Sequence, residues 1–300
     1  MEDIIRPVEH DYNMVRVALY AISNNYPFTK LESIGKSVLG RDIPALRIGG
    51  GSNTILYAAA FHGMERLTTL IVLRFAEHLC RAVSLGSKIA GIDVHKTLAA
   101  KSLVIVPVVN PDGCEIALSG ATGCGRWAAK IHNLCKGDFS IWNANARGVD
   151  INHNFNAGWK ILQEMEADAG IYGPAPTRYG GPRPESEPET AALVEFCREH
   201  KPSHVLAWHS QGEEIYWHYG SRTPKRSANM AKILANSSGY SLEAPIGLAS
   251  HGGFKDWFIE EFGRPGFTIE IGKGKNPLDS ALLDPIYNQL EEMMMLCCVI

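Results

Sequence analysis

A histidine and a glutamate lie three residues apart in the segment FHGME, as His62 and Glu65, directly after a short apolar run. Imidazole nitrogens and carboxylate oxygens are ligands that Zn²⁺ prefers, and a catalytic zinc site uses three protein ligands and leaves one position for water. Two donors on one tight turn can reach the same ion without a large loop-closure cost. The third ligand must come from elsewhere, and His209, at the end of another apolar run, is the candidate.

Each of these residues also has a simpler interpretation when it is considered alone. An isolated HxxE pair is more often a surface ion pair at the start of a helix. A single histidine after a strand is more often a hydrogen-bonded core residue. Glu270 is a further candidate, because it lies between Ile269 and Ile271 in an apolar run. A glutamate there costs free energy unless it is paired or functional. A functional role is favoured over a salt bridge at the end of a strand.

The elements that must position these residues alternate between buried strands and amphipathic helices. The sequence predicts strands at 54–61, 103–109, 204–208 and 266–271, a hairpin over 31–48, a turn at 110–113 (NPDG), and helices near 11–26, 66–83, 186–200, 224–238, 253–263 and 279–297. This order predicts an α/β fold in which helices cover both faces of a mostly parallel, mixed sheet. Ligand sites of such sheets lie beyond the carboxyl ends of the strands, where His62, His209 and Glu270 are expected to converge.

The composition predicts one globular enzyme domain spanning residues 1–300. Hydrophobic residues make up 45% and charged residues 20% of the chain, so a large core can be buried. The net charge of −3 gives no electrostatic reason to expect nucleic acid or an anionic membrane as a partner. Seven cysteines without a CxxC pair indicate neither a disulfide framework nor a cysteine zinc site, and free thiols suit a reducing cytosol. The first six residues have no apolar signal core and no apolar run is long enough to span a membrane, which predicts a cytoplasmic protein.

Six motifs, in order along residues 10–290, resemble those of the zinc carboxypeptidase family, which includes carboxypeptidase A. They are the His62–Glu65 pair, NPDG at 110–113, GVDINHNF at 148–155 beside the family's GVDLNRNF, SEPET at 186–190, His209, and TIEIG at 268–272. The resemblance implies a three-layer α/β/α sandwich around a mixed, twisted, mostly parallel sheet. It also implies one zinc ion held by His62, Glu65 and His209, with Glu270 as general base and acid. This is chemically consistent, because zinc lowers the pKa of bound water from about 15.7 towards 7 and a nearby carboxylate can carry its proton to the leaving amine.

Three departures from the family pattern concern the substrate or the transition state. Asn152 and His153 stand where the family has an Asn-Arg pair that grips a C-terminal carboxylate, and a neutral histidine lacks the permanent charge and bidentate fork of arginine. His251 resembles a mobile tyrosine in position; it either donates a hydrogen bond to the substrate or lies on a flexible glycine-rich loop. Arg147 is the candidate for the arginine that stabilises the oxyanion, with a structural ion pair to Asp150 or another acid as the alternative.

Acidic residues near the motifs differ in their expected roles. Glu187 and Glu189, at the start of a predicted helix, complement the helix macrodipole and are interpreted as structural. Glu213 and Glu214 follow His209 closely, and they either reach a cationic group of the substrate or belong to a solvated turn.

The segment around Arg147 resembles the bacterial branch of the family that cleaves γ-D-glutamyl-diaminopimelate bonds in cell-wall peptides. We therefore predict a zinc-dependent metallopeptidase that hydrolyses an amide bond near the end of a small peptide, with a murein peptide as the substrate that the resemblance implies. One alternative is a zinc amidohydrolase, or deacylase, that acts on N-acyl amino acids. Another is a non-catalytic binding protein on the same scaffold, against which the presence of all three ligand candidates and Glu270 argues.

Overall fold

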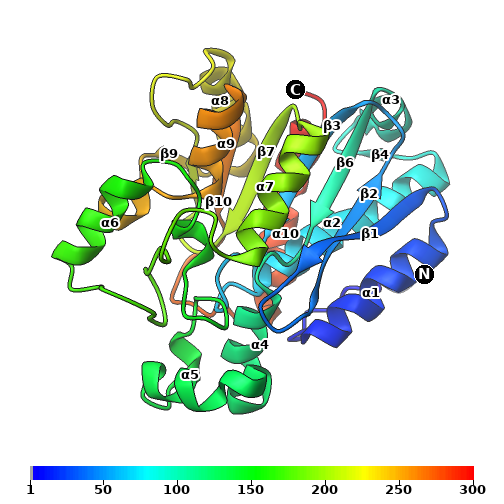
Figure 1. The fold of residues 1–300 in the computed structure, drawn as a ribbon. Coiled ribbons are helices and arrows are strands. Elements are labelled where there is room, and N and C mark those ends of the chain that lie inside the picture. Colours follow the sequence, from blue (N-terminus) through cyan, green and yellow to red (C-terminus); the bar gives the residue numbers. More distant parts are fainter. Residues whose placement is uncertain (1–2) are drawn as a thin grey trace.

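An eight-stranded mixed sheet forms the centre of the computed structural model, which describes residues 3–300, so that Met1 and Glu2 of the N-terminal segment lie outside it (Figure 1). In spatial order its strands are β1 (Thr29–Lys36), β2 (Asp42–Ile48), β6 (Lys101–Val106), β3 (Asn53–Ala59), β7 (His204–His209), β10 (Gly266–Glu270), β8 (Glu214–Tyr216) and β9 (Ser241–Glu243). The central strands β6, β3, β7 and β10 are parallel, and antiparallel neighbours flank them on both sides. The carboxyl ends of the parallel strands therefore meet at one edge.

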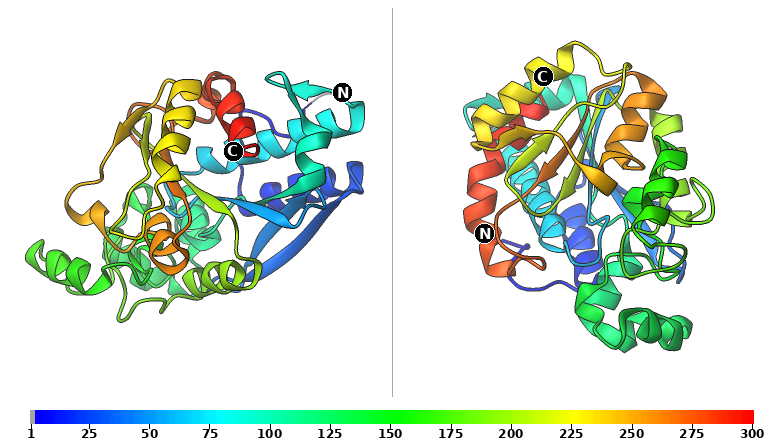
Figure 2. Two further views of the ribbon diagram at one scale, coloured as in Figure 1. Left: turned by 90° about the horizontal axis from the view of Figure 1, so that it is seen from above. Right: turned by 90° about the vertical axis from the view of Figure 1, so that its left-hand side faces the viewer.

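Helices cover both faces of this sheet (Figure 2). One face packs against α1 (Tyr12–Asn25), α2 (Leu67–Leu85), α3 (Val94–Ala100), α8 (Arg226–Ser238) and α10 (Leu283–Cys297), and the other against α7 (Pro188–His200) and α9 (Phe254–Phe262). In β3, Ile55 and Tyr57 join the first apolar cluster, whereas Leu56 and Ala58 join the second. Because successive side chains point to opposite faces, a strand covered on both sides must be apolar throughout. The predicted three-layer sandwich is confirmed.

The remaining elements extend this framework at its ends. Helices α4 (Pro111–Ser119) and α5 (Ala128–Cys135) enclose a third apolar cluster, and α6 (Trp159–Asp168) lies apart from them (Figure 1). A two-stranded sheet, β4 (Lys88–Ile89) and β5 (Ile92–Asp93), and short 3₁₀ segments complete the chain: η1 (Gly120–Trp127), η2 (Phe139–Ile141), η3 (Ile151–His153), η4 (Gly247–Ser250) and η5 (Ser280–Leu282). Within residues 3–300, no helix is both long and apolar enough to cross a membrane.

The segment 110–113 differs from the prediction, because it starts a helix instead of forming a free turn. Asn110 caps α4: its Oδ1 accepts a hydrogen bond from the Gly113 N–H at 2.8 Å. Pro111 follows in the first turn, where its missing N–H costs nothing. The Nδ2 of Asn110 donates to the carbonyl of Phe61 at 3.0 Å, so the same side chain joins α4 to the segment that follows β3.

The chain turns sharply at Ala60, directly after β3. Ala60 has a φ of 51°, in the left-handed region that a residue with a Cβ adopts at a cost of about 1 kcal/mol. Its N–H donates to Thr68 Oγ1 at 3.0 Å, and its carbonyl accepts from the Asn110 N–H at 3.0 Å. Strain of this kind concentrates at functional sites. These bonds fix the direction in which the segment 61–65 leaves the sheet.

Two buried carboxylates attach the β1–β2 turn to helices α4 and α7. Asp112, on α4, accepts from Ser37 Oγ at 2.8 Å and pairs with Arg41 Nη1 at 2.6 Å. Glu189, on α7, accepts from the N–H of Val38 at 3.1 Å. Burial, and then the charge of Asp112, raise the pKa of Glu189 to about 8. Glu189 is therefore protonated at neutral pH, and its role is to bind the hairpin rather than to complement the helix dipole.

The protonated state of Glu189 makes stability depend on pH. The folded protein keeps a proton that the unfolded chain releases near pH 4.5, so this stabilisation is complete below that pH and is lost as the pH rises through about 8. Relative to Glu189→Gln, the free energy of unfolding of the wild type should fall by about 1.4 kcal/mol per pH unit across that window. Urea unfolding of both proteins at several pH values measures this difference in the free energy of unfolding. The glutamine side chain does not titrate, so its own effect on stability is the same at every pH. Parallel curves for the two proteins would show that Glu189 is ionised throughout.

Candidate metal centre

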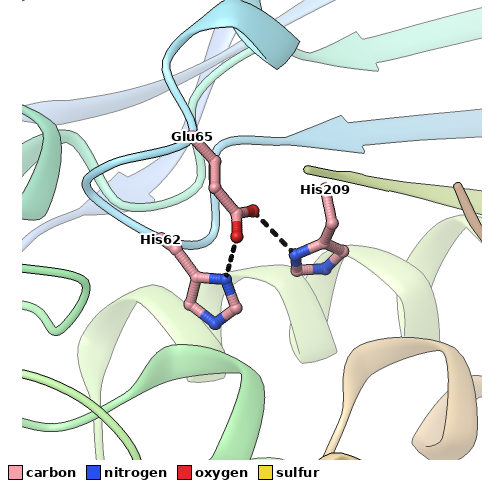
Figure 3. A group of neighbouring side chains, drawn as sticks. All are labelled: His62, Glu65 and His209. Carbon is pink, nitrogen blue, oxygen red and sulfur yellow. Dashed lines mark hydrogen bonds and ion pairs between the residues drawn. The ribbon is translucent and has the colours of Figure 1, made fainter. Parts of the chain in front are cut away.

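Three donor side chains from two separate segments converge at the carboxyl edge of the sheet (Figure 3). His62 and Glu65 lie in the loop between β3 and α2, and His209 is the last residue of β7. One carboxylate oxygen of Glu65 lies 2.9 Å from His62 Nδ1, and the other lies 3.0 Å from His209 Nδ1. One ligand atom from each residue lies within 4.8 Å of the other two. The structure therefore brings together the three residues that the sequence analysis assigned to zinc.

The turn 62–65 is tightly enclosed by neighbouring backbone. A Cβ added to Gly63 would lie 2.3 Å from the carbonyl oxygen of Gly113 and 2.4 Å from that of Trp142. Asn143 also holds the turn, because its carbonyl accepts from the Gly63 N–H at 3.1 Å and its Oδ1 accepts from the next N–H along the chain at 3.3 Å. Only glycine fits at this position, and the spacing of His62 and Glu65 is fixed by its surroundings.

Asp150 orients His62 from the side opposite Glu65. Its Oδ1 lies 3.1 Å from His62 Nε2, so Nε2 carries the proton and the Nδ1 lone pair can face a metal. The other oxygen of Asp150 accepts from the Arg178 N–H at 2.9 Å. Burial raises the pKa of Asp150, but the charges of His62 and His153 and these hydrogen bonds outweigh it, and the pKa lies far below its ordinary value. The arrangement is the carboxylate–histidine pair that supports metal ligands in many zinc sites.

The charges of the cluster suit a cation. Burial raises the pKa of Glu65, but the charges of His62 and His209 outweigh it and bring it down to about 2. Burial lowers the pKa of His209. Burial also lowers that of His62, but Glu65 and Asp150 outweigh it and hold the pKa well above its usual value. The ionised carboxylates therefore attract a positive charge, which either a proton on His62 or a divalent ion can supply. The donor set, two nitrogens and one oxygen, fits zinc.

Glu270 lies beside this cluster through the register of the sheet. It is the residue opposite His209 on the neighbouring parallel strand, and the Ile271 N–H donates to the His209 carbonyl at 2.8 Å. Burial raises the pKa of Glu270 well above its ordinary value, and the negative charges of Glu65 and Glu214 act in the same direction. A carboxylate at the edge of a metal cluster can accept a proton and return it.

Glu213 and Glu214 occupy different environments. Glu214 is opposite Glu270 on the antiparallel strand β8, and its Oε2 accepts from the Tyr216 hydroxyl at 2.7 Å. Glu213 instead pairs with the exposed Lys273 at 2.6 Å, while its N–H donates to the Glu270 carbonyl. Glu214 is therefore the better placed of the two to meet a substrate.

Asn152 and His153 are both held by hydrogen bonds within the chain. Asn152 Oδ1 accepts a hydrogen bond at 3.0 Å from the N–H of Phe254, the first residue of α9. His153 is buried, and its Nδ1 lies 3.0 Å from Glu166 Oε1 and 3.2 Å from the carbonyl of Arg178. Asn152 and His153 belong to the 3₁₀ turn that follows Asp150. Both residues therefore lie close to the carboxylate that orients His62.

His251 lies on a glycine-rich loop, but the ring is fixed by a partner. Its Nδ1 lies 2.9 Å from the hydroxyl of Tyr219. A Cβ added to Gly158 would come within 2.5 Å of the His251 ring and 2.6 Å of that hydroxyl. The pair therefore closes over the backbone at Gly158, and a role in binding substrate stays a prediction.

Arg147 is half exposed, and its Nη1 lies 3.4 Å from Glu187 Oε2. It lines a pocket of about 380 Å³ together with Lys130 and Arg183, among others. Glu187 is buried and also accepts from Asn145 Nδ2 at 2.7 Å. The structural ion pair that the sequence left open is therefore present, and the role of Arg147 towards the oxyanion stays a prediction.

Two polar residues near the centre were not assigned to it from the sequence. Asp150 was considered only as a partner of Arg147, which pairs with Glu187 instead. Asp150 lies within the GVDINHNF motif, and its position two residues before the Asn-His pair is a signal that could have identified it. Asn143 carries no such signal, because its role depends on a backbone contact with a turn far away in the chain.

Comparison with known proteins agrees with this geometry. A family model described as zinc carboxypeptidase matches residues 15–293. The chain is 37% identical over 285 residues to gamma-D-glutamyl-L-diamino acid endopeptidase 1 of Lysinibacillus sphaericus. The matched region covers 93% of this chain and 70% of that protein. It is also 35% identical over 283 residues to protein YqgT of Bacillus subtilis, with 93% and 74% covered.

Solved structures share the fold at lower identity. Bovine thrombin-activatable fibrinolysis inhibitor superposes with a TM-score of 0.76 at 19% identity, over 98% of this chain and 97% of that one. Murein-tripeptide amidase MpaA of Escherichia coli O157 gives 0.55 at 20% identity, over 89% and 91%. The family model spans almost the whole chain, and the sequence relatives match over most of both lengths. The chain therefore belongs to the zinc carboxypeptidase family and is a hydrolase of that family.

Proposed function

We propose that the protein hydrolyses a γ-D-glutamyl–diamino acid bond in small murein peptides, with one zinc ion held by His62, Glu65 and His209. The observation that carries the proposal is the placement of Glu270 in register beside His209, so that a carboxylate of raised pKa borders the three-donor cluster. The names of the Lysinibacillus endopeptidase and of the murein-tripeptide amidase support the substrate class.

Each residue of the proposed site has a chemical task. Zinc, when bound, polarises the amide carbonyl and lowers the pKa of a water molecule. Glu270 accepts a proton from water as the water oxygen bonds to the carbonyl carbon. It then delivers that proton to the amine nitrogen as the C–N bond breaks. Asp150 keeps His62 in the tautomer that leaves Nδ1 free to bind. Arg147 is our proposed donor to the developing oxyanion.

The charges around the site favour a substrate that carries an amine. Glu214 lies directly beside Glu270, where its carboxylate can accept from an ammonium group. His153 and His251, our candidates for substrate binding with Asn152, supply no permanent positive charge for a terminal carboxylate. A diamino acid offers the additional amine that this arrangement can hold.

The state of the cysteines supports a proposal for the cellular compartment of the protein. All seven are free and buried. Free thiols persist in a reducing compartment. We propose a cytoplasmic location, which suits the recycling of imported wall peptides.

The substrate proposal is tested by comparing kcat/KM for a γ-D-glutamyl-diaminopimelate peptide, an ordinary C-terminal dipeptide and an N-acyl amino acid. We expect the first to be the best substrate, with activity lost in a chelator and restored by zinc. A faster N-acyl substrate would favour the amidohydrolase alternative. Stoichiometric zinc without turnover of any amide would favour a binding protein on this scaffold.

The base is tested by Glu270→Gln. An amide cannot take up the proton of water, so turnover should fall by orders of magnitude while zinc content, measured by mass spectrometry, stays at one ion per chain. Glu213→Gln is the matched control, because its side chain faces Lys273. Near wild-type turnover in Glu270→Gln would remove Glu270 from this role.

The oxyanion role is tested by Arg147→Ala. If the guanidinium acts only in the transition state, kcat should fall by about 100- to 1000-fold with little change in KM. Arg183→Ala, which alters another arginine of the same pocket, is the control and should keep its kcat. An unchanged kcat in Arg147→Ala would leave the residue as the ion-pair partner of Glu187.

A further inference from the structure

Glu166 is a buried carboxylate that the proposed chemistry does not use. It lies on α6 and is almost completely buried. Its Oε2 accepts from the Gly180 N–H at 3.1 Å and from Gln163 Nε2 at 2.9 Å, and its Oε1 faces His153 Nδ1 at 3.0 Å. Buried carboxylates are rare unless they are paired, so this side chain has a defined task.

The partners of His153 determine which of its nitrogens carries a proton. Both groups near Nδ1, the carboxylate of Glu166 and the carbonyl of Arg178, can only accept hydrogen bonds. Nδ1 must therefore donate. In the neutral ring the other nitrogen, Nε2, then holds a lone pair and is an acceptor.

Nε2 is available to a ligand. It makes no hydrogen bond to the side chains or backbone of residues 3–300, and 10% of the side chain is exposed. The N–H of His153 donates to the Asp150 carbonyl at 3.1 Å, and the Asp150 carboxylate contacts His62, so His153 lies near the metal centre.

We propose that Glu166 holds His153 with Nε2 as an acceptor, and that this nitrogen takes an N–H donor of the substrate instead of a terminal carboxylate. The inference rests on the proposed peptide substrate and narrows it. An arginine at this position favours a carboxylate, such as the one at the end of a peptide. An acceptor tolerates an amide N–H of a chain that continues, or the amine of a diamino acid. The protein then acts as an endopeptidase, and Glu166 is a positioning residue.

The first test measures the tautomer without relying on turnover. Nitrogen-15 shifts of the histidine rings at neutral pH, with His153→Gln to assign the signal, should show Nδ1 protonated and Nε2 bare. In Glu166→Gln this preference should weaken, whereas in Gln163→Ala, which removes only a neighbour of Glu166, it should persist. A ring protonated on Nε2, alone or on both nitrogens, would overturn the proposal.

The second test uses four matched substrates: γ-D-glutamyl-L-lysine and γ-D-glutamyl-L-norleucine, each with a free carboxylate or a carboxamide. The wild type should prefer the carboxamides, the lysine peptides, or both, by roughly tenfold in kcat/KM, the effect of one hydrogen bond to a buried acceptor. The carboxamide arm identifies a backbone amide as the donor. The lysine arm supports His153 as the acceptor only if the preference is lost in His153→Gln, because Glu214 can also accept from the amine. His153→Arg should reverse the order towards free carboxylates, and Glu166→Gln should reduce the preference mainly through KM.

The outcomes separate this inference from the proposed function. A wild type that favours free carboxylates tenfold, or one that does not discriminate, would overturn the acceptor role while leaving the peptidase intact. Failure to cleave any of the four substrates with zinc bound would count against the proposed function, and the tautomer would still decide the state of His153.

Discussion

The parallel pairing of β3, β7 and β10 is the constraint on which the site depends. It fixes the order of the strands and their register, so that the loop after β3, the last residue of β7 and the last residue of β10 reach the same edge. His209 and Glu270 are direct neighbours for this reason alone. Parallel strands need long crossovers, and here these crossovers supply α2, α3, α7, α8 and α9 of the helices that cover the two faces. The placement of His209 and Glu270 is thus a property of the sheet, and a loop supplies His62 and Glu65.

A second level of structure holds the loops against this edge. Asn110 caps α4 and bonds to the segment after β3, and Asp112 and Glu189 attach the β1–β2 turn to helices α4 and α7. These residues belong to motifs that the chain shares with its family, yet none of them contacts the three donors. Their contribution is positional, and it explains why motifs without catalytic residues accompany the metal ligands.

The sequence predicted those parts of the fold that carry a local signal. The buried strands at 54–61, 103–109, 204–208 and 266–271 are confirmed to within a few residues, because a strand covered on both faces is apolar throughout. The three-residue strands β8 and β9 were missed, since so short an alternation has no recognisable period. The segment 110–113 was taken as a turn because the same residue types, asparagine and proline, also begin helices.

The candidate site shows the same division. His62, Glu65 and His209 were grouped correctly through the order of motifs, not through their spacing, which has no physical meaning until the strands are paired. The partners of His153 could not be predicted, because Glu166 is thirteen residues away on a separate helix and the contact depends on how α6 is packed. The position of a side chain such as His153 is set by tertiary contacts of this kind. Ligands that lie at strand ends are set by topology.

The enclosure of Gly63 has a thermodynamic consequence for metal exchange. The backbone of Gly113 and that of Trp142 leave no space in which the turn 62–65 could open, so its conformational entropy is lost when the protein folds and not when the ion binds. Association with zinc therefore orders little beyond the side chains themselves. For an ion held there, we expect release to require rotation of the His62 side chain or local unfolding. We therefore expect an ion bound by a rigid turn of this kind to leave slowly.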